Sequence, residues 1–396
     1  MRIALISTDY PPLCSSAAVQ LRDLAQEFVR QGHEPVVLVP ADGLAKMWTE
    51  EILDGVQVLR LGALSTKNRG YVWRTISEFL LPFFMLYGIR KSPIQTSQWD
   101  AVIWYSPSIF FGPLVAQLKR SSRCRSYLIL RDIFPEWALD LGLIKKGLGY
   151  HFFKVIARYQ YGLADTIGVQ SPSNLEYITQ YIKSPEKHLQ VLQNWLAIAP
   201  NVGSSILLNS TSLSGKTIFV YIGNMGVAQG MDILIDLAGS LKSRQDIGFL
   251  FVGRGSDVAR LRSKAVKQDL DNILFYDEVD SREMPGLLGQ CHIGLVALDP
   301  RHKTHNIPGK FLTYVQAGIP VLARINSGTD LADLIEREGV GRVYVGAELS
   351  ELKKIAEQMV DDHAARNKMS VKGRALSLRM FSPEATVKQI VEVLSA

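Results

Sequence analysis

The sequence predicts an α/β protein built from two tandem, doubly wound domains. Two observations support this prediction. Short apolar runs typical of buried strands alternate with segments of helical periodicity along most of the 396 residues. The alternation stops at a polar, serine-rich segment, residues 201–215, and then starts again. We therefore expect a first domain at 1–200, a second domain at 201–378 and a last helix within 379–396.

The first domain is expected to form a βαβ series with six buried strands. These strands are residues 2–6, 35–39, 100–104, 127–130, 166–170 and 189–192. The segment 19–30 has apolar residues at helical spacing and is expected to form the first crossover helix. The loop before it is rich in small residues, among them Ser15 and Ser16, but it lacks the G-x-G-x-x-G pattern of nicotinamide dinucleotide sites.

The second domain repeats the pattern with six more strands. They are residues 217–222, 249–252, 273–276, 292–298, 319–323 and 341–345. Helices are expected between these strands, including one at 310–316 that stops at Gly318. A last helix is expected at 383–394, because Ser382 and Pro383 suit the N-cap and the first position of a helix.

Polar loops follow several strands of the second domain and should meet at the carboxyl edge of its sheet. They contain the candidate ligand-binding residues Gly223, Asn224, Met225, Gly226, Gln229, Gly253, Arg254, Pro308, Gly309 and Asn326. Glycine lets backbone N–H groups approach phosphate oxygens, and a helix N-terminus favours an anion. We therefore expect a diphosphate ligand at this edge.

Lys310 is unusual because it lies in the first turn of the helix predicted at 310–316. A cation there opposes the helix dipole, so another interaction should account for it. A phosphate is the obvious candidate, and a merely solvated lysine is the alternative.

Charged residues also follow a buried strand of the first domain. Arg131 and Asp132 come directly after the strand at 127–130, and Glu136 lies in the turn beyond them. Charged side chains at the end of a buried strand are candidates for chemistry. The alternative is an Arg–Asp pair that only closes the edge of the sheet.

Two segments of the first domain combine basic and aromatic residues. Segment 70–91 has a nearly continuous apolar run that Pro82 interrupts and that Arg90 and Lys91 follow. The run is about half of the ~20 residues that a spanning helix needs. It therefore either lies on a bilayer or packs as a buried amphipathic helix. Segment 144–161 interleaves basic and aromatic residues in the same way, and no nucleic-acid motif accompanies it, so we expect a membrane partner rather than nucleic acid.

The charge of the chain supports an anionic partner for the first domain. The net charge is +6, and residues 60–91 carry six basic residues against one acidic residue, whereas residues 119–158 carry nine against three. The three cysteines are far apart, which argues against a disulfide framework and a cysteine-based zinc site and favours a reducing cytoplasm. The first apolar run is too short for a signal peptide.

These motifs together resemble a glycosyltransferase of the GT-B fold, and more narrowly the retaining family 4, or group 1, enzymes. The resemblance rests on the two α/β halves, the glycine loop that opens the second, and the pattern P-x-K-x-x-x-Y-x-x-A-G-x-P-V that starts at Pro308. The run IPGKFLTYVQAGIPVLA, followed by N-x-G-x-D, is similar to the WbuB-like branch, which transfers N-acetyl-L-fucosamine-type sugars in bacterial O-antigen or capsule synthesis.

This resemblance implies two Rossmann-like domains with a cleft between them. The second domain would hold a UDP-sugar and the first a polyprenyl-diphosphate-linked saccharide, without a metal or another cofactor. Lys310 would stabilise the departing diphosphate, and Asp132 would accept or orient the proton of the acceptor hydroxyl. The last helix would cross back onto the first domain. The candidate acceptor-binding residues are Ser15, Ser16, Arg131 and Glu136.

The sequence departs from the family pattern at two places. The usual basic pair after the glycine loop is replaced by Asn224 and Gln229, and the two glutamates of an E-x7-E motif by His305 and Thr313. We include all four residues among the candidates for donor binding. For His305, a solvated loop histidine is the alternative.

A lipid-linked acceptor places the protein in the cytoplasm, bound peripherally to the anionic inner face of the plasma membrane. Two other functions are alternatives. One is a GT-B-type UDP-sugar 2-epimerase, which needs neither acceptor nor membrane. The other is a non-enzymatic module that binds anionic lipid. The basic–aromatic segments argue against the epimerase.

Overall fold

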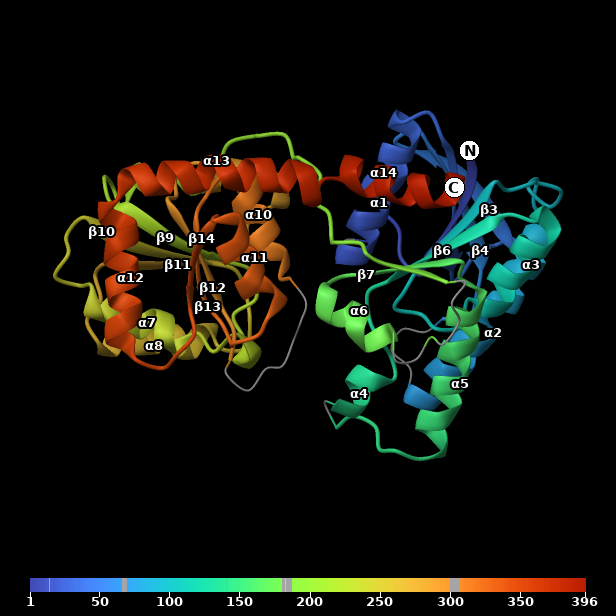
Figure 1. The fold of residues 1–396 in the computed structure, drawn as a ribbon, viewed down its shortest axis with the longest axis horizontal. Coiled ribbons are helices and arrows are strands. Elements are labelled where there is room, and N and C mark those ends of the chain that lie inside the picture. The colour runs from blue at the N-terminus through green and yellow to red at the C-terminus, as the bar shows by residue number, and fades with distance from the viewer. Residues whose placement is uncertain (14, 66–69, 141, 180–181, 183–186, 300–306) are drawn as a thin grey trace. The chain divides into compact units, whose positions relative to one another are not determined.

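The computed structural model describes residues 1–396 except 14, 66–69, 141, 180–181, 183–186 and 300–306. The chain divides into two compact units (Figure 1). Unit 1 comprises Met1–Trp195 and Pro383–Ala396, and unit 2 comprises Leu196–Ser382. Each unit is a largely parallel sheet with helices on both faces, which confirms the predicted fold class.

Unit 1 is built on an eight-stranded sheet of order β3-β4-β2-β1-β5-β6-β7-β8. Its strands are β1 (Arg2–Ile6), β2 (Glu34–Ala41), β3 (Trp48–Leu53), β4 (Val56–Gly62), β5 (Ala101–Tyr105), β6 (Arg125–Leu130), β7 (Thr166–Val169) and β8 (His188–Val191). All neighbours pair in parallel except β3 and β4. The order of the strands reverses between β1 and β5, which is where doubly wound sheets bind ligands at the carboxyl ends of their strands.

Helices cover both faces of this sheet. One face packs against α1 (Ser16–Arg30) and α14 (Pro383–Ser395), and the other against α2 (Tyr71–Arg90), α3 (Gly112–Ser122), α5 (Leu148–Leu163) and α6 (Pro172–Thr179). A short helix, α4 (Glu136–Asp140), follows β6. The side chains of β1 alternate between the two cores, as the pleat of a strand requires.

The last helix, α14, belongs to unit 1 although the chain reaches it from unit 2. Val387, Ile390 and Leu394 pack in the same core as α1, and the Gln389 side chain donates to the carbonyl oxygen of Val191 at 2.7 Å. The end of the chain therefore completes the core of the first unit.

Unit 2 is built on a six-stranded parallel sheet of order β11-β10-β9-β12-β13-β14. Its strands are β9 (Thr217–Ile222), β10 (Ile247–Val252), β11 (Ile273–Tyr276), β12 (Ile293–Ala297), β13 (Val321–Arg324) and β14 (Gly341–Tyr344). This is the strand order of dinucleotide-binding folds, and it places the switch point between β9 and β12.

The helices of unit 2 also lie on two faces. One core packs α7 (Asp232–Ser240), α8 (Val258–Lys267) and α12 (Leu349–Asp361). The other packs α9 (Met284–Leu288), α10 (Gly309–Ala317) and α11 (Asp330–Glu338). The long helix α13 (His363–Met380) contributes Met369 to the first core and Leu376 to the second.

Several elements lie outside those predicted from the sequence, among them the β3–β4 hairpin and helices α3, α4, α12 and α13. The hairpin turns at Asp54 and Gly55, whose φ angles are 50° and 81°. An Asp-Gly pair with positive φ at both residues is typical of a tight hairpin turn, so a signal for this element was present in the sequence.

Candidate functional site

The predicted donor-binding loops of unit 2 meet at the carboxyl edge of its sheet, at the switch point. Loop 223–226 follows β9, loop 253–256 follows β10, and α10 begins after β12. The first two loops touch through their backbones, because a Cβ on Gly253 would lie 2.1 Å from the carbonyl oxygen of Gly223. Likewise, a Cβ on Gly255 would lie 2.2 Å from the carbonyl oxygen of Met225. Residues without a side chain are therefore required at both positions.

Lys310 is held against the glycine loop by Tyr221, the fifth residue of β9. The Lys310 ammonium donates to the Tyr221 hydroxyl at 2.7 Å and lies 4.2 Å from the centroid of its ring. The hydroxyl in turn donates to the carbonyl oxygen of Asn224 at 2.6 Å. Tyr221 is fully buried, and this burial raises the pKa of its phenol, so it remains neutral and can donate. Tyr221 thus joins the cation to the loop.

The Lys310 ammonium is partly buried, and desolvation lowers its pKa to about 8. Within the part of the chain that the structure describes, no carboxylate lies within ion-pair distance of it. A desolvated cation without a counter-ion is unfavourable, and an anionic ligand would supply the missing partner. The structure therefore favours the phosphate interpretation of Lys310 over that of a solvated lysine.

The backbone amides of loop 223–226 are largely engaged within the protein. The Gly223 amide donates to the carbonyl oxygen of Val252 at 2.9 Å, and the Met225 amide to that of Arg254 at 2.8 Å. The side-chain oxygen of Gln229 accepts from the Gly226 amide and from the Asn224 side chain, both at 3.0 Å. We expected these amides to face a diphosphate, but in the structure they maintain the shape of the loop.

The helix α10 offers donors of its own at this edge. Pro308 is its N-cap and provides no side-chain capping bond. Among the described residues, the amides of Gly309 and Lys310 have no acceptor. The N-terminus of α10 and the Lys310 ammonium are therefore the groups best placed to bind phosphate oxygens.

The other predicted donor-binding residues occupy the same edge. Arg254 is exposed and forms an ion pair with Glu278 at 3.0 Å. The Thr313 hydroxyl donates to the carbonyl oxygen of Gly309 at 3.2 Å, and the Asn326 side chain donates to that of Asp299 at 3.1 Å. The Met225 side chain is fully buried in the core. This buried side chain therefore packs in the core and stabilises the conformation of the loop. His305 lies outside the described residues.

In unit 1, Arg131 and Asp132 do not form the ion pair that was the alternative to a functional role. The Arg131 side chain is buried and donates to the carbonyl oxygens of Leu192 at 2.7 Å and Gln193 at 3.3 Å. Its guanidinium also lies 4.9 Å from the ring of Trp195. Arg131 thus ties the end of β6 to the segment after β8.

Asp132 is exposed, and its amide donates to the Ser106 hydroxyl at 3.4 Å. Desolvation by the surrounding protein raises the pKa of its carboxyl group, whereas the charge of Arg131 lowers it. The carboxylate of Asp132 therefore remains a candidate for contact with an acceptor hydroxyl.

The remaining acceptor candidates differ in their surroundings. Glu136 is buried, 3.4 Å from the ammonium of Lys154, and accepts from the Tyr150 hydroxyl at 3.4 Å. These bonds give it a structural role. The Ser15 hydroxyl caps α1 by accepting from the Ala18 amide, and it donates to the Asp9 carboxylate at 2.7 Å. Ser16 is exposed at the first position of α1.

A cavity of about 440 Å³ opens at the switch point of unit 1, among loops that follow β1, β2, β4 and β5. Helix α2 forms another wall. The charged side chains that line it are Asp9, Asp42, Arg60, Arg74 and Glu78. Arg60 is bound to Glu51 at 2.5 Å and to the carbonyl oxygen of Pro11, and Arg74 pairs with Glu78 at 2.8 Å. These residues were not predicted as a site from the sequence. The signal that the sequence offered for this site was a charged residue shortly after a buried strand, as at Asp9.

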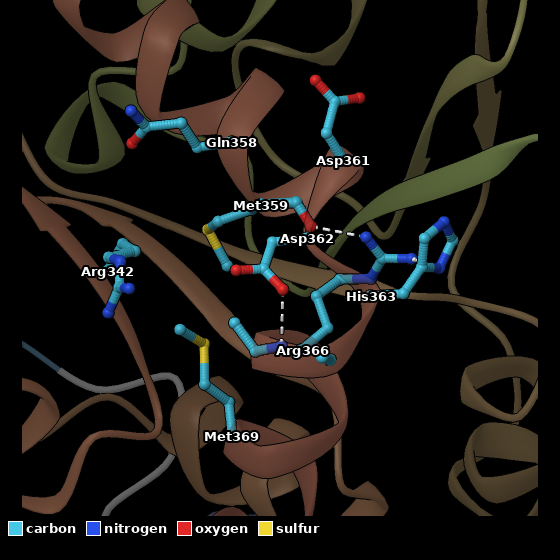
Figure 2. A pocket seen from close by; sticks show the side chains of 10 residues that line it. Arg342, Gln358, Met359, Asp361, Asp362, His363, Arg366 and Met369 are labelled. Atoms are coloured by element: carbon cyan, nitrogen blue, oxygen red, sulfur yellow. Dashed lines mark hydrogen bonds between the residues drawn. The ribbon is translucent and has the colours of Figure 1, made fainter.

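A second cavity, of about 670 Å³, lies in unit 2 where α12 ends and α13 begins, beside the start of β14 (Figure 2). Figure 2 shows Arg366 pointing toward the end of α12, where it donates to the carbonyl oxygens of Met359 at 2.6 Å and of Val360. Another bond of 2.6 Å joins it to His363. These bonds cap a helix, and the cavity lies at the amino edge of the sheet, so we assign it to the scaffold.

In the described ranges, no three His, Cys, Asp or Glu side chains gather as metal ligands. No helix in those ranges is long and apolar enough to cross a bilayer. The metal independence of the protein stays a prediction.

Comparisons with known proteins agree with this architecture. Residues 216–362 match the family model described as "Glycosyl transferases group 1". The chain is 27% identical over 370 residues to WcaI of Escherichia coli K12, which is named as a colanic acid biosynthesis glycosyl transferase, and the alignment covers 85% of this chain and 86% of WcaI. It is 23% identical over 219 residues to WbjE of Pseudomonas aeruginosa, named as a glycosyltransferase, and this alignment covers 54% of each chain.

Among solved structures, HepE of Anabaena in complex with UDP and glucose is similar in fold. The TM-score is 0.67 at 16% sequence identity, over 100% of this chain and 99% of HepE. The chain has two doubly wound units, and its candidate ligand-binding loops lie at the carboxyl edge of the sheet of unit 2. It is a protein of the GT-B fold. The family match covers much of unit 2, and the named relatives, at 23% and 27% identity, are glycosyltransferases to which the chain is similar. Specificity of the WbuB-like type stays a prediction.

Replacing Tyr221 with phenylalanine is expected to weaken UDP binding about two- to tenfold, because the Lys310 ammonium loses a hydrogen bond of ordinary strength. That bond favours the charged amine, so its loss should lower the pKa of Lys310 below about 8. UDP affinity, measured by calorimetry from pH 6 to 9.5, should then start to fall at a lower pH than in the wild type.

The matched control is Tyr344→Phe. It removes a comparable hydroxyl-to-carbonyl bond of 2.7 Å, to Glu348, at the end of another strand of the same sheet. Tyr344→Phe should leave the pH profile of UDP binding unchanged. Equal profiles for the two variants would show that Tyr221 does not support the ammonium.

Proposed function

We propose that the protein is a retaining glycosyltransferase that transfers an N-acetylated hexosamine or deoxyhexosamine from a UDP-sugar. N-acetyl-L-fucosamine is the specific candidate. The acceptor is a polyprenyl-diphosphate-linked saccharide in the synthesis of a bacterial surface polysaccharide, such as O-antigen or capsule. The observation that carries this proposal is Lys310, a desolvated ammonium that is fixed beside the glycine loop at the carboxyl edge of the sheet of unit 2 and that pairs with no carboxylate among the described residues.

Two comparisons support the substrate classes. HepE, which shares the fold, has been solved with UDP and with UDP-glucose, and a UDP-sugar is consistent with the donors gathered around Lys310. WcaI, which aligns over most of the chain, is named for colanic acid biosynthesis. The proposed location follows from the acceptor: a polyprenyl carrier lies in the membrane, so the enzyme works in the cytoplasm at the inner face of the plasma membrane.

In the proposed reaction, the bond between the anomeric carbon and the β-phosphate oxygen breaks. A new bond forms between that carbon and the acceptor oxygen, with retention of configuration. The departing UDP gains negative charge, which the Lys310 ammonium and the N-terminal amides of α10 stabilise. The hydroxyl proton of the acceptor leaves with the departing phosphate oxygen or passes to Asp132. Neither route needs a metal ion.

We assign the acceptor saccharide to the 440 Å³ cavity of unit 1. Its carboxylates, at Asp9 and Asp42, suit the hydroxyl groups of a sugar. Its guanidinium groups, at Arg60 and Arg74, suit the diphosphate. Both kinds of group converge at the switch point, where a doubly wound sheet binds its ligand.

A donor screen tests the proposed function. The purified protein is incubated with a panel of UDP-N-acetylhexosamines, with and without a polyprenyl-diphosphate-linked saccharide, and UDP release is measured in the presence of EDTA. We expect release that the acceptor accelerates and EDTA does not abolish, with a product that keeps the anomeric configuration of the donor. Absence of both UDP release and a UDP-induced rise in Tm would contradict the proposal. A 2-epimer formed without acceptor would identify an epimerase.

A further inference from the structure

Helix α2 exposes a stripe of apolar side chains along one face. The members follow one another at helical spacing: Val72, Ile76, Phe79 and Phe83. The opposite side of the same helix is in the core, through Leu81, Met85 and Ile89. One face of the helix thus packs on the sheet, as the buried interpretation of segment 70–91 predicts, and the other face meets solvent.

Helix α5 carries a second stripe of the same kind. Its members are Leu148, Phe152, Val155 and Tyr159, again three or four residues apart, and Leu148 is 92% exposed. The two stripes meet, because the ring centroids of Phe79 and Phe152 are 6.3 Å apart. The two helices lie along the same side of unit 1 (Figure 1). Together these eight residues form one exposed apolar surface, the α2–α5 face. A contiguous exposed apolar surface of this kind often marks an interaction site.

The surroundings of the α2–α5 face are cationic. The basic residues on or next to the two helices are Arg74, Arg90, Lys91, Lys145, Lys146, Lys154 and Arg158. Of these, Arg74 pairs with Glu78 and Lys154 with Glu136, so the basic border consists of Arg90, Lys91, Lys145, Lys146 and Arg158. An apolar, aromatic centre with a basic border fits the interface of an anionic bilayer, in which the rings enter the headgroup region and the cations contact phosphates.

Helix α2 also borders the cavity of unit 1. Arg74, Glu78 and Leu81 line that cavity, whereas Val72, Ile76 and Phe79 belong to the α2–α5 face. One helix therefore has one side in the proposed acceptor site and the adjacent side on the apolar surface. A lipid-linked saccharide held in the bilayer would have its diphosphate at the level of this helix.

We propose that the α2–α5 face docks on the anionic surface of a bilayer and that α2 admits the headgroup of a membrane-bound acceptor to the cavity. The identity of the acceptor rests on the proposed function, whereas the docking does not. The apolar stripes supply the insertion, and the basic border supplies the preference for anionic lipid.

Co-sedimentation with vesicles tests the docking. The triple variant Val72→Gln, Leu148→Gln and Val155→Gln replaces side chains that are 66–92% exposed, so its fold should be preserved. The matched control is the triple Val266→Gln, Val371→Gln and Leu378→Gln in unit 2, whose side chains are 60–78% exposed. On vesicles of phosphatidylcholine and phosphatidylglycerol, we expect the face variant to lower the partition coefficient at least tenfold and the control variant to leave it unchanged.

A charge variant separates the two contributions to binding. Lys145→Gln with Lys146→Gln should lower binding to anionic vesicles about tenfold and leave binding to pure phosphatidylcholine unchanged. The control, Lys267→Gln with Lys372→Gln, removes two exposed lysines from unit 2 and should have no effect. All four variants should keep the UDP-induced rise in Tm of the wild type, which shows that the donor site is intact.

Three results would overturn the docking: a wild-type protein that binds no vesicles, an equal loss in both triple variants, or a face variant that abolishes self-association in the ultracentrifuge but keeps vesicle binding. The link to the acceptor has its own test. With a polyprenyl acceptor in vesicles, the face variant should lose at least tenfold in rate, and with a water-soluble, short-chain acceptor it should match the wild type.

If UDP release is absent in every protein while vesicle binding follows the expected pattern, the proposed function fails and the docking stands.

Discussion

Replacing Lys310 with methionine is expected to lower kcat by about 10²–10³. Methionine keeps the length of the side chain and removes the charge. In the structure the ammonium is fixed by Tyr221 beside the glycine loop, next to the N-terminus of α10. In the proposed reaction, the diphosphate gains charge mainly as the sugar leaves, so the loss should appear in kcat more than in KM.

The same variant is expected to be at least as stable as the wild type at pH 7. Desolvation lowers the pKa of Lys310 from 10.5 to about 8, a difference that corresponds to ~3 kcal/mol. The folded protein bears this cost fully below pH 8, where Lys310 is charged in the folded and the unfolded state. The cost disappears as the pH rises from 8 to 10.5, because the folded protein then holds the neutral amine. The Lys310→Met variant has no such cost. The amount by which it is more stable than the wild type should therefore shrink between pH 8 and pH 10.5.

Steady-state UDP release and thermal unfolding at pH 7 and 9.5 check this prediction. The control is Lys267→Met, which removes an exposed lysine from α8 and should change neither quantity. A variant that is less active but equally or more stable would show that the lysine is kept for function at the expense of stability. Wild-type turnover in Lys310→Met would contradict the role in leaving-group stabilisation.

The parallel strands were largely predictable from the sequence because both of their faces are buried. The run Ile273–Tyr276, for example, forms β11 with the predicted bounds. The β3–β4 hairpin was not predicted, because β3 lies at the edge and its acidic residues, Glu50 and Glu51, interrupt the apolar pattern. Helix α13 was missed for a related reason: it contacts two cores, so its apolar residues do not form one stripe.

The candidate site was predictable only in part. Lys310 was recognisable because a cation is unfavourable in the first turn of a helix. Its partner Tyr221, 89 residues earlier, looks like any aromatic residue of a buried strand. The acceptors of the Gly223 and Met225 amides, the carbonyl oxygens of Val252 and Arg254, lie far along the chain, so no local sequence pattern indicates these bonds. In unit 1, Arg131 was a candidate because it directly follows a buried strand. In the structure, its guanidinium donates to backbone carbonyl oxygens.

A substitution of Gly253 by alanine is expected to lower UDP affinity at least tenfold and the free energy of unfolding by roughly 2–4 kcal/mol. Gly253 has φ +146°, and a Cβ there would lie 2.1 Å from the carbonyl oxygen and 3.1 Å from the nitrogen of Gly223. Backbone atoms cannot rotate away as a flexible side chain can. Loop 223–226 must therefore shift, and its link through Tyr221 would carry the displacement to Lys310.

Gly215→Ala separates backbone strain from this clash. Gly215 also has a positive φ, +73°, but a Cβ there has nothing within 4 Å, and the residue precedes β9 at the amino edge of the sheet. The Gly215→Ala substitution should lower the free energy of unfolding by about 1 kcal/mol and leave UDP affinity unchanged. Calorimetry with UDP and urea unfolding of both variants decide the matter. If the two alanines have equal effects on UDP binding, the close approach of the two loops does not shape the donor site. A selective loss in Gly253→Ala would show that glycine is required there so that Lys310 can reach the diphosphate.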